Sequence, residues 1–139
     1  MRFVVPEKKK LVYEMTIPIR WGDMDAMSHI NNTLYFRYME TARIDWCESL
    51  GIMPEQSKQG IVIINAYCTF RQQLRYPGGV LTKMYVTDVG RSSFGTYVTM
   101  ERADAPGLVW ADGGAKMVWL DYSTNKSLPM PDRLRQRIS

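Results

Sequence analysis

Residues Arg20 to Tyr35 read RWGDMDAMSHINNTLY, and this stretch organises the rest of the chain. A β-prone segment precedes it, and a long apolar pattern with helical spacing follows it. Asparagine is a favoured N-cap because its side-chain oxygen accepts a hydrogen bond from a free amide of the first turn, so Asn31 or Asn32 is predicted to open the helix. The acidic loop then lies beside the positive end of the helix dipole. A carboxylate, the only histidine and a helix start that meet at one point predict a catalytic site.

The composition fits one globular domain spanning residues 1–139, with 45% hydrophobic and 23% charged residues. The net charge of +4 is compatible with nucleic acid, an anionic membrane surface, a phosphate-bearing ligand, or solubility alone. No run of 18 apolar residues occurs, so no membrane span is expected. The N-terminus is too short for the apolar region of a signal peptide, and we expect a cytoplasmic protein.

The two cysteines, Cys47 and Cys68, lie in apolar patterns and have no Cys-x-x-Cys partner. Together with a single histidine they leave little from which to build a zinc site. We therefore expect buried free thiols and no metal centre.

Hydrophobic periodicity predicts one long helix and five strands, and Pro131 favours a second, short helix. The strands are expected at 11–21, 61–75, 80–89, 93–103 and 108–120, the long helix at about 32–50, and a short C-terminal helix starting near Pro131. Pro18 favours an edge strand or a bulge, Gly51 a helix C-terminus, and Gly113-Gly114 a bulge or a close backbone approach. Glu40 and Arg43 are spaced as an i,i+3 pair. This order predicts an α+β fold in which an antiparallel sheet wraps around one long central helix.

The order Asp-x-Asp-x-x-x-His-x-Asn-Asn-x-x-Tyr, from Asp23 to Tyr35, is followed by Glu40-Thr-Ala-Arg43. This pattern resembles the signature of the 4-hydroxybenzoyl-CoA thioesterase-like branch of the hotdog-fold acyl-CoA thioesterases. The downstream order of elements is similar too, so the resemblance covers nearly the whole chain. It implies a hotdog fold and hydrolysis of an acyl-CoA thioester to free acid and coenzyme A.

The resemblance implies that Asp25, the second aspartate of the motif, is the general base or the nucleophile. It also implies that the backbone amide of Asn32, seven residues later, stabilises the carbonyl oxygen. His29 would assist by binding the carbonyl or orienting water, and Tyr35 would lie near the pocket mouth. The structural alternatives are a turn or helix cap for Asp25, capping by Asn32, a hydrogen-bonding role for His29, and an aromatic core position for Tyr35. Asp23 fits a turn residue.

In resembling enzymes the turn at Arg91-Ser92-Ser93 helps to hold the phosphates of coenzyme A, for which a guanidinium and hydroxyls are suitable donors. Arg-Ser is also a common turn composition. Arg75 and Lys83 are further candidates for the same task. Asn65 and Thr69, on the polar face of the long strand, are expected to bind substrate near a neighbouring subunit.

The interpretation is an acyl-CoA thioesterase without metal or redox cofactor, whose coenzyme A belongs to the substrate. Open sheet edges are usually paired or covered, so a homodimer is expected, with its active site at the subunit interface. The resemblance implies a homotetramer, a dimer of dimers, as the other assembly. The alternative is a non-catalytic acyl-CoA or acyl-carrier-protein binding protein on the same fold. A hydratase would need a different acid–histidine motif, and the basic and aromatic residues are too few to favour a nucleic-acid reader.

Overall fold

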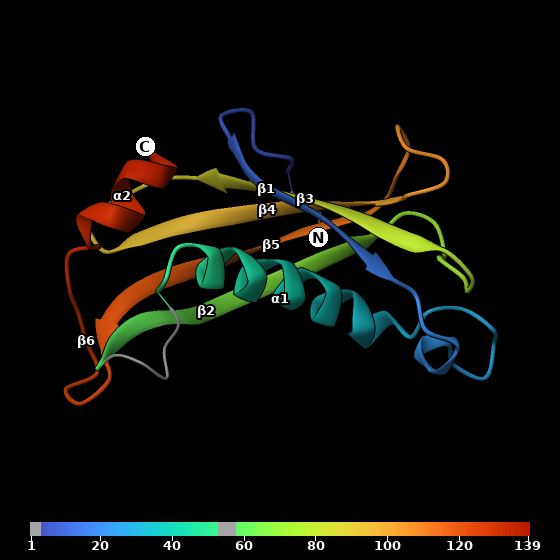
Figure 1. Cartoon of the computed structure of the whole chain (residues 1–139), viewed down its shortest axis with the longest axis horizontal. Helices are drawn as coiled ribbons and strands as arrows, with labels where there is room; N and C mark the ends of the chain where they lie inside the picture. The colour runs from blue at the N-terminus through green and yellow to red at the C-terminus, as the bar shows by residue number, and fades with distance from the viewer. Residues whose placement is uncertain (1–3, 53–57) are drawn as a thin grey trace.

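One long helix, α1, lies across one face of an antiparallel sheet (Figure 1). The computed structural model describes residues 4–52 and 58–139. The elements are β1 (Lys10–Pro18), the short 3-10 helix η1 (Trp21–Asp23), α1 (Asn32–Ser49), β2 (Gln59–Phe70), β3 (Gly79–Thr87), β4 (Ser93–Arg102), β5 (Val109–Asp121), β6 (Lys126–Ser127) and α2 (Asp132–Ile138). The predicted α+β architecture, a sheet wrapped around one helix, is confirmed.

The strand order is β1-β3-β4-β5-β2, with β6 paired to the outer end of β5. All the pairings are antiparallel. β1 is therefore an edge strand. Pro18, at its end, has no amide hydrogen to donate, and an edge strand tolerates that loss. The predicted edge position of Pro18 is confirmed. The other edge is β2, whose only strand partner in the described part of the chain is β5.

β2 differs from its prediction in length and in phase. The expected strand reached residue 75, but β2 ends at Phe70, where the amides of Arg71 and Gln72 both donate to the carbonyl of Trp110. The pairing register also shifts between Ile63 and Asn65, which leaves Ile64 as an extra residue. A bulge reverses the alternation of side chains, so the residues before and after Ile64 do not follow one continuous alternation.

The remaining bounds deviate by small amounts, with two exceptions. The first strand stops at Pro18 rather than residue 21, and η1 takes up the end of that segment. The two-residue β6 was not predicted. The short helix does follow Pro131, which is its N-cap.

Both ends of α1 are closed by local hydrogen bonds. Asn31 is the N-cap, and its Oδ1 accepts from the amide of Thr33 at 3.0 Å. At the other end Gly51 has φ 68°, and its amide donates to Glu48 while that of Ile52 donates to Cys47. These two bonds form a Schellman motif with glycine in the left-handed position, as Gly51 was predicted to allow.

α1 packs closely on the sheet because β5 carries glycine beneath it. Met39 is fully buried, and a Cβ placed on Gly113 would lie 3.1 Å from its Sδ and 2.1 Å from the carbonyl oxygen of Tyr67. The register runs unbroken through Gly113 and Gly114 on both sides of β5. Of the two alternatives for this pair, close approach is therefore correct.

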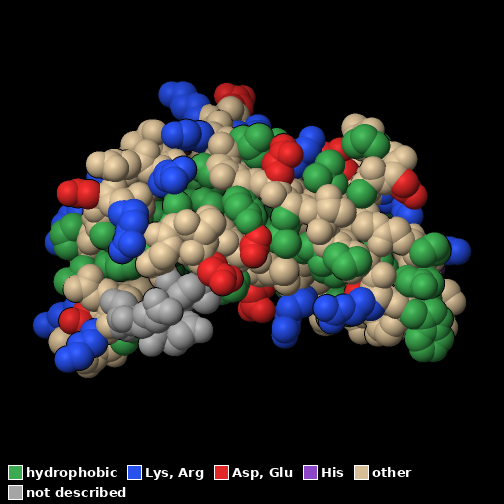
Figure 2. Space-filling model, in the orientation of Figure 1, with side chains coloured by type: hydrophobic (Ala, Val, Ile, Leu, Met, Phe, Trp, Pro, Cys, Tyr) green, Lys and Arg blue, Asp and Glu red, His purple; other side chains and the backbone are tan. Residues whose placement is uncertain are grey.

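The side of α1 away from the sheet is open. Phe36 and Ile44 are 38% and 43% exposed, and Figure 2 shows hydrophobic side chains at the surface on the α1 face of the molecule. The outer side of α1 is therefore not covered within one chain. Glu40 pairs with Arg37 at 3.4 Å, whereas the predicted partner, Arg43, is buried.

Cys47 and Cys68 are free thiols, as predicted, although Cys68 is only partly buried. Burial raises the pKa of Cys47 to about 11 and that of Cys68 to about 12, so neither is a reactive thiolate at neutral pH. No helix in residues 4–52 and 58–139 has the length and apolar character needed to cross a membrane.

Candidate active site

A tight loop brings Asp25 and His29 together just before α1. The amide of Asp25 donates to the carbonyl of His29 at 2.8 Å, and the amide of Ser28 donates to the carbonyl of Asp25 at 3.0 Å. Ser28 has φ 63°, a left-handed conformation that the reversal of the chain requires. The amide of Ile30 then donates to the carbonyl of Leu74, which fixes the loop to the segment after β2.

The two carboxylate oxygens of Asp25 differ in their surroundings. Oδ1 accepts from the amides of Met27 at 2.8 Å and His29 at 3.4 Å. No group in the described residues donates to Oδ2, and the side chain is exposed. One oxygen therefore shapes the loop, as the turn alternative predicts, while the other remains open to a ligand or water.

Asn32 is the first helical residue, and Asn31 is the cap that precedes it. The amides of Thr33 and Leu34 donate to the side chain and carbonyl of Asn31, whereas the amide of Asn32 donates to no acceptor in the described chain. A free amide in the first turn, at the positive end of an 18-residue helix, is a fixed donor for a developing negative charge.

A pocket of about 280 Å³ joins these groups. It is lined by Asp25, Met27, His29, Ile30, Asn32, Tyr35, Phe70 and Gln73. All four motif residues predicted for the site, namely Asp25, His29, Asn32 and Tyr35, thus share one cavity at the start of α1.

His29 contacts an arginine from a distant part of the sequence. Its Nε2 lies 2.8 Å from Nη2 of Arg75, in the loop after β2. Within the described ranges, no three His, Cys, Asp or Glu side chains converge as metal ligands.

Tyr35 is a wall of the pocket rather than a free hydroxyl. It is 2% exposed, its ring lies 4.9 Å from that of Phe70, and its oxygen accepts from the amide of Leu74 at 3.0 Å. Burial raises the pKa of the hydroxyl. Tyr35 is therefore a core residue that also lines the pocket, and its role in substrate binding stays a prediction.

Asp23 has a structural place, as its turn interpretation suggested. Its Oδ2 accepts from the hydroxyl of Tyr38 at 2.8 Å and from the amide of Arg20 at 3.1 Å. These bonds tie the loop to the first turns of α1. Burial, and then the bond to Asp23, raise the pKa of Tyr38.

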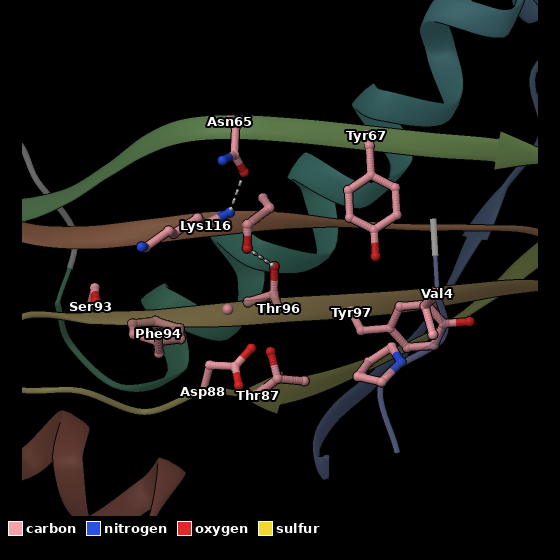
Figure 3. Close-up of a pocket in the computed structure, with 13 residues that line it drawn as sticks. Val4, Asn65, Tyr67, Thr87, Asp88, Ser93, Phe94, Thr96, Tyr97 and Lys116 are labelled. Atoms are coloured by element: carbon pink, nitrogen blue, oxygen red, sulfur yellow. Dashed lines mark hydrogen bonds between the residues drawn. The ribbon is translucent and has the colours of Figure 1, made fainter. Parts of the chain in front are cut away.

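Asn65 and Ser93 lie elsewhere, in a groove of about 420 Å³ on the outer face of the sheet (Figure 3). Oδ1 of Asn65 accepts from the amide of Lys116 at 3.2 Å, next to the bulge. Thr69 lies opposite Asp112 in the β2–β5 register. Substrate binding by Asn65 and Thr69 stays a prediction.

The turn at Arg91-Ser92-Ser93 is at the other end of the sheet from the Asp25 pocket. Phe70, at the pocket, is paired with Ala111, whereas Ser93 is paired with Val118. Ala111 and Val118 are seven positions apart on β5, or about 23 Å at roughly 3.3 Å per residue. A single chain therefore does not bring this turn to the pocket.

Within the turn, Arg91 donates to Oγ of Ser92 at 3.2 Å, and Arg135 of α2 donates to the carbonyls of Gly90 and Arg91. Lys83, the other candidate for phosphates, forms an ion pair with Glu101 at 3.2 Å. A phosphate-binding role for Arg91, Ser92 and Ser93 remains a prediction.

Sequence reasoning did not find Phe70 and Gln73, and it named Arg75 only for phosphates. Phe70 and Gln73 reach the pocket, and Arg75 reaches His29, because β2 ends early and the chain turns back toward Ile30. Their separation from the motif is more than thirty residues, and no periodic pattern connects the two segments. A correct prediction of where β2 ends would have indicated these residues, but the bulge and the turn hide that end in the sequence.

Comparison with known proteins agrees with this fold. Residues 19–138 match the model of the Thioesterase-like superfamily. The PA2801 protein of Pseudomonas aeruginosa, named as a proposed thioesterase, is 36% identical, with TM-score 0.90 over 94% of this chain and 100% of that chain. The BH1999 gentisyl-coenzyme A thioesterase shares the fold at 22% identity, with TM-score 0.79 over 91% of this chain and 100% of that chain.

A protein of Xanthomonas campestris, named as a proposed acyl-CoA thioesterase, is 27% identical, with TM-score 0.77 over 87% of this chain and 100% of that chain. The family match covers most of the residues, including the whole motif, and the chain belongs to the Thioesterase-like superfamily. It has the hotdog fold and is a thioester hydrolase, as the resemblance implied.

Proposed function

We propose that this protein hydrolyses acyl-CoA thioesters with Asp25 as the catalytic carboxylate. The observation that carries the proposal is the shared pocket, which is lined both by Asp25, whose Oδ2 is open, and by Asn32, whose amide is free. If Asp25 takes a proton from the attacking water, the C–S bond breaks and the coenzyme A thiolate leaves with that proton. If Asp25 attacks the carbonyl itself, the thiolate leaves as an anhydride forms; water then hydrolyses the anhydride, restores the carboxylate and supplies the proton for the thiolate.

The amide of Asn32 would donate to the carbonyl oxygen as negative charge develops on it. Such a backbone donor is already oriented by the helix, so no reorganisation accompanies the reaction. The side chain of Asn32 is not needed for this role, and the cap at Asn31 keeps the amide in place.

The pocket is small for an acyl-CoA, since ligand sites commonly occupy roughly 300–1,000 Å³. It lies at the end of β2, the edge whose Ile63 and Ile64 are 39% and 55% exposed. We propose that β2 pairs antiparallel with β2 of a second copy. Unpaired apolar edges are normally protected, and this pairing would protect the edge of β2. We propose that the second copy also covers the exposed Phe36 and Ile44 of α1.

A two-fold axis near the middle of β2 would reverse the ends of the partner's sheet. Ser93 of the second copy would then lie level with Cys68 of the first copy. The two would be about three strand spacings apart, or roughly 14 Å. This arrangement makes the turn at 91–93 a candidate for the nucleotide of a substrate held in the other subunit's pocket.

The decisive experiment is a panel of acyl-CoAs, with short aliphatic, long aliphatic and hydroxybenzoyl groups, assayed for released thiol. We include aromatic esters because one protein of this fold is a gentisyl-coenzyme A thioesterase. Turnover of at least one class is expected. A second arm with the same acyl groups on acyl-carrier protein separates the two possible donors.

The alternative is a binding protein that holds acyl-CoA without cleaving it. Such a protein would show saturable affinity by calorimetry and no release of thiol from any member of the panel. That result would refute the catalytic role of Asp25.

A further inference from the structure

The contact between His29 and Arg75 determines which nitrogen of the imidazole carries the proton. The two atoms, Nε2 of His29 and Nη2 of Arg75, are 2.8 Å apart. A guanidinium has donors only and keeps its protons, so Nε2 must be the acceptor. The single ring proton of a neutral His29 is then on Nδ1, which is not the tautomer that free histidine prefers.

Arg75 is free to hold this position because no acidic side chain competes for it. The four ion pairs in the described residues join Arg37 to Glu40, Arg71 to Asp112, Lys83 to Glu101 and Arg102 to Asp104. Arg75 belongs to none of them, so its bond to His29 is the side-chain hydrogen bond that the structure assigns to it.

A second arginine fixes the backbone around Arg75. Arg102 donates to the carbonyl of Arg75 at 3.0 Å and to that of Pro77 at 2.7 Å. Asp104 accepts from Arg102 at 2.9 and 3.0 Å, and this bond lowers the pKa of Asp104. The guanidinium of Arg102 is therefore held in place by its ion pair with Asp104.

The segment is held from the other side by the site itself. The amide of Leu74 donates to the hydroxyl of Tyr35, and the carbonyl of Leu74 accepts from the amide of Ile30. Both Tyr35 and Ile30 line the pocket. The backbone that carries Arg75 is therefore tied at Leu74, Arg75 and Pro77.

We propose that Arg75 is a positioning residue that holds His29 in the Nδ1–H tautomer, so that the imidazole serves the site as a hydrogen-bond donor. Nε2 cannot take a proton from water while its lone pair accepts from Arg75. Where water is the nucleophile, its proton must then go to Asp25. This consequence rests on the proposed thioester hydrolysis, but the tautomer itself does not.

The test is nitrogen-15 NMR of the imidazole, which is unambiguous because the chain has one histidine. Spectra of the full-length protein without substrate are recorded at about pH 9, well above the ordinary imidazole pKa of about 6.5. The intact protein is expected to show a protonated Nδ1 and an unprotonated Nε2. Arg75→Met should shift the population to Nε2–H, whereas Arg75→Lys, which keeps a donor, should retain the Nδ1–H form at least in part.

Arg133→Met is the matched control, since it removes an exposed arginine from α2 and should leave the imidazole spectrum unchanged. An Nε2–H tautomer in the intact protein overturns the proposal, and so does an unchanged spectrum in Arg75→Met. If Arg75→Met does not fold, the spectrum of the intact protein decides the matter alone.

Activity provides the second readout. In Arg75→Met we expect kcat for the best acyl-CoA to fall by about tenfold or more with KM changed less, and Arg75→Lys to recover part of the loss. A protein with the expected tautomer but no turnover would refute the proposed function and leave the role of Arg75 in place. Equal changes in KM and kcat in both variants would contradict the mechanistic consequence.

Discussion

Asp25 combines a structural acceptor and an open oxygen on one carboxylate. Asparagine can reproduce the first, because its Oδ1 can still accept from the amides of Met27 and His29. It cannot act as a base or a nucleophile. We therefore expect Asp25→Asn to lower kcat by about 10²-fold or more while the thermal unfolding midpoint stays close to that of the unaltered protein.

Steady-state release of thiol and thermal unfolding measure the two effects. Asp132→Asn, which neutralises an exposed carboxylate in α2, is the control and should retain full activity. Activity of Asp25→Asn within a few-fold of the unaltered enzyme would remove Asp25 from the mechanism.

At the scale of the element, the start of α1 connects stability to chemistry. Asn31→Ala removes the acceptor for the amide of Thr33, and loss of such a cap costs about 1 kcal/mol of unfolding free energy. The first turn also frays, so the amide of Asn32 loses its fixed direction. We expect a lower kcat together with the lower stability, measured by denaturant unfolding and thiol release.

Thr41→Ala tests whether the loss of any side-chain hydrogen bond in α1 would lower kcat in the same way. The hydroxyl of Thr41 bonds to the carbonyl of Arg37 in the same helix, away from its first turn. This variant should leave kcat unchanged, and an equal loss of kcat in both variants would argue against a special role for the helix start.

β5 provides the surface on which α1 rests, and Gly113 is the tightest point. An added Cβ would press on the backbone of β2 and on Met39, so Gly113→Ala should lower the unfolding free energy by about 1–3 kcal/mol. Gly22→Ala is the control, because nothing lies within 4 Å of its added Cβ. A neutral Gly113→Ala in denaturant unfolding would mean that the sheet can move away from the helix at little cost.

Most of the elements could be predicted from the sequence because their signals are local. Asn31, Gly51 and Pro131 mark helix ends through bonds within a few residues, and buried and partly buried side chains alternate along most of β3. The bulge at Ile64 could not be predicted, since Ile63, Ile64 and Val62 are all apolar and fit either phase.

The same distinction applies to the site. The motif brings Asp25, His29 and Asn32 together within eight positions of sequence, and the structure places them in one pocket. Arg75 follows His29 by 46 positions, and its approach depends on where β2 ends and how Arg102 holds the next turn. Such a tertiary contact has no local pattern.

At the scale of the whole molecule, the proposed pairing of β2 edges makes a direct prediction. Ile64→Lys places a charge on the exposed edge and should convert the dimer to a monomer with reduced activity. Light scattering after size-exclusion chromatography measures the mass. Leu108→Lys, at another exposed apolar position, is the control and should remain dimeric. A monomeric unaltered protein would contradict the proposal.

The predicted phosphate contact also depends on the assembly. Arg91→Ala should raise KM for acyl-CoA by about tenfold, the scale of one lost charge-assisted bond, but leave KM for the matching acyl-pantetheine unchanged. Arg133→Ala, an exposed arginine in the neighbouring α2, should change neither value. A similar rise for both substrates would exclude contact with the nucleotide.

The extra residue at Ile64 has a consequence for aggregation. A uniform, flat edge accepts strands in many alignments, which is how open-ended fibrils grow. An edge interrupted at its centre offers matching ladders only on either side of the kink, and the side chain of Asn65 already occupies an amide of the neighbouring β5 there. Growth from this edge should therefore stop at two copies, and the protein should remain clear in concentrated solution.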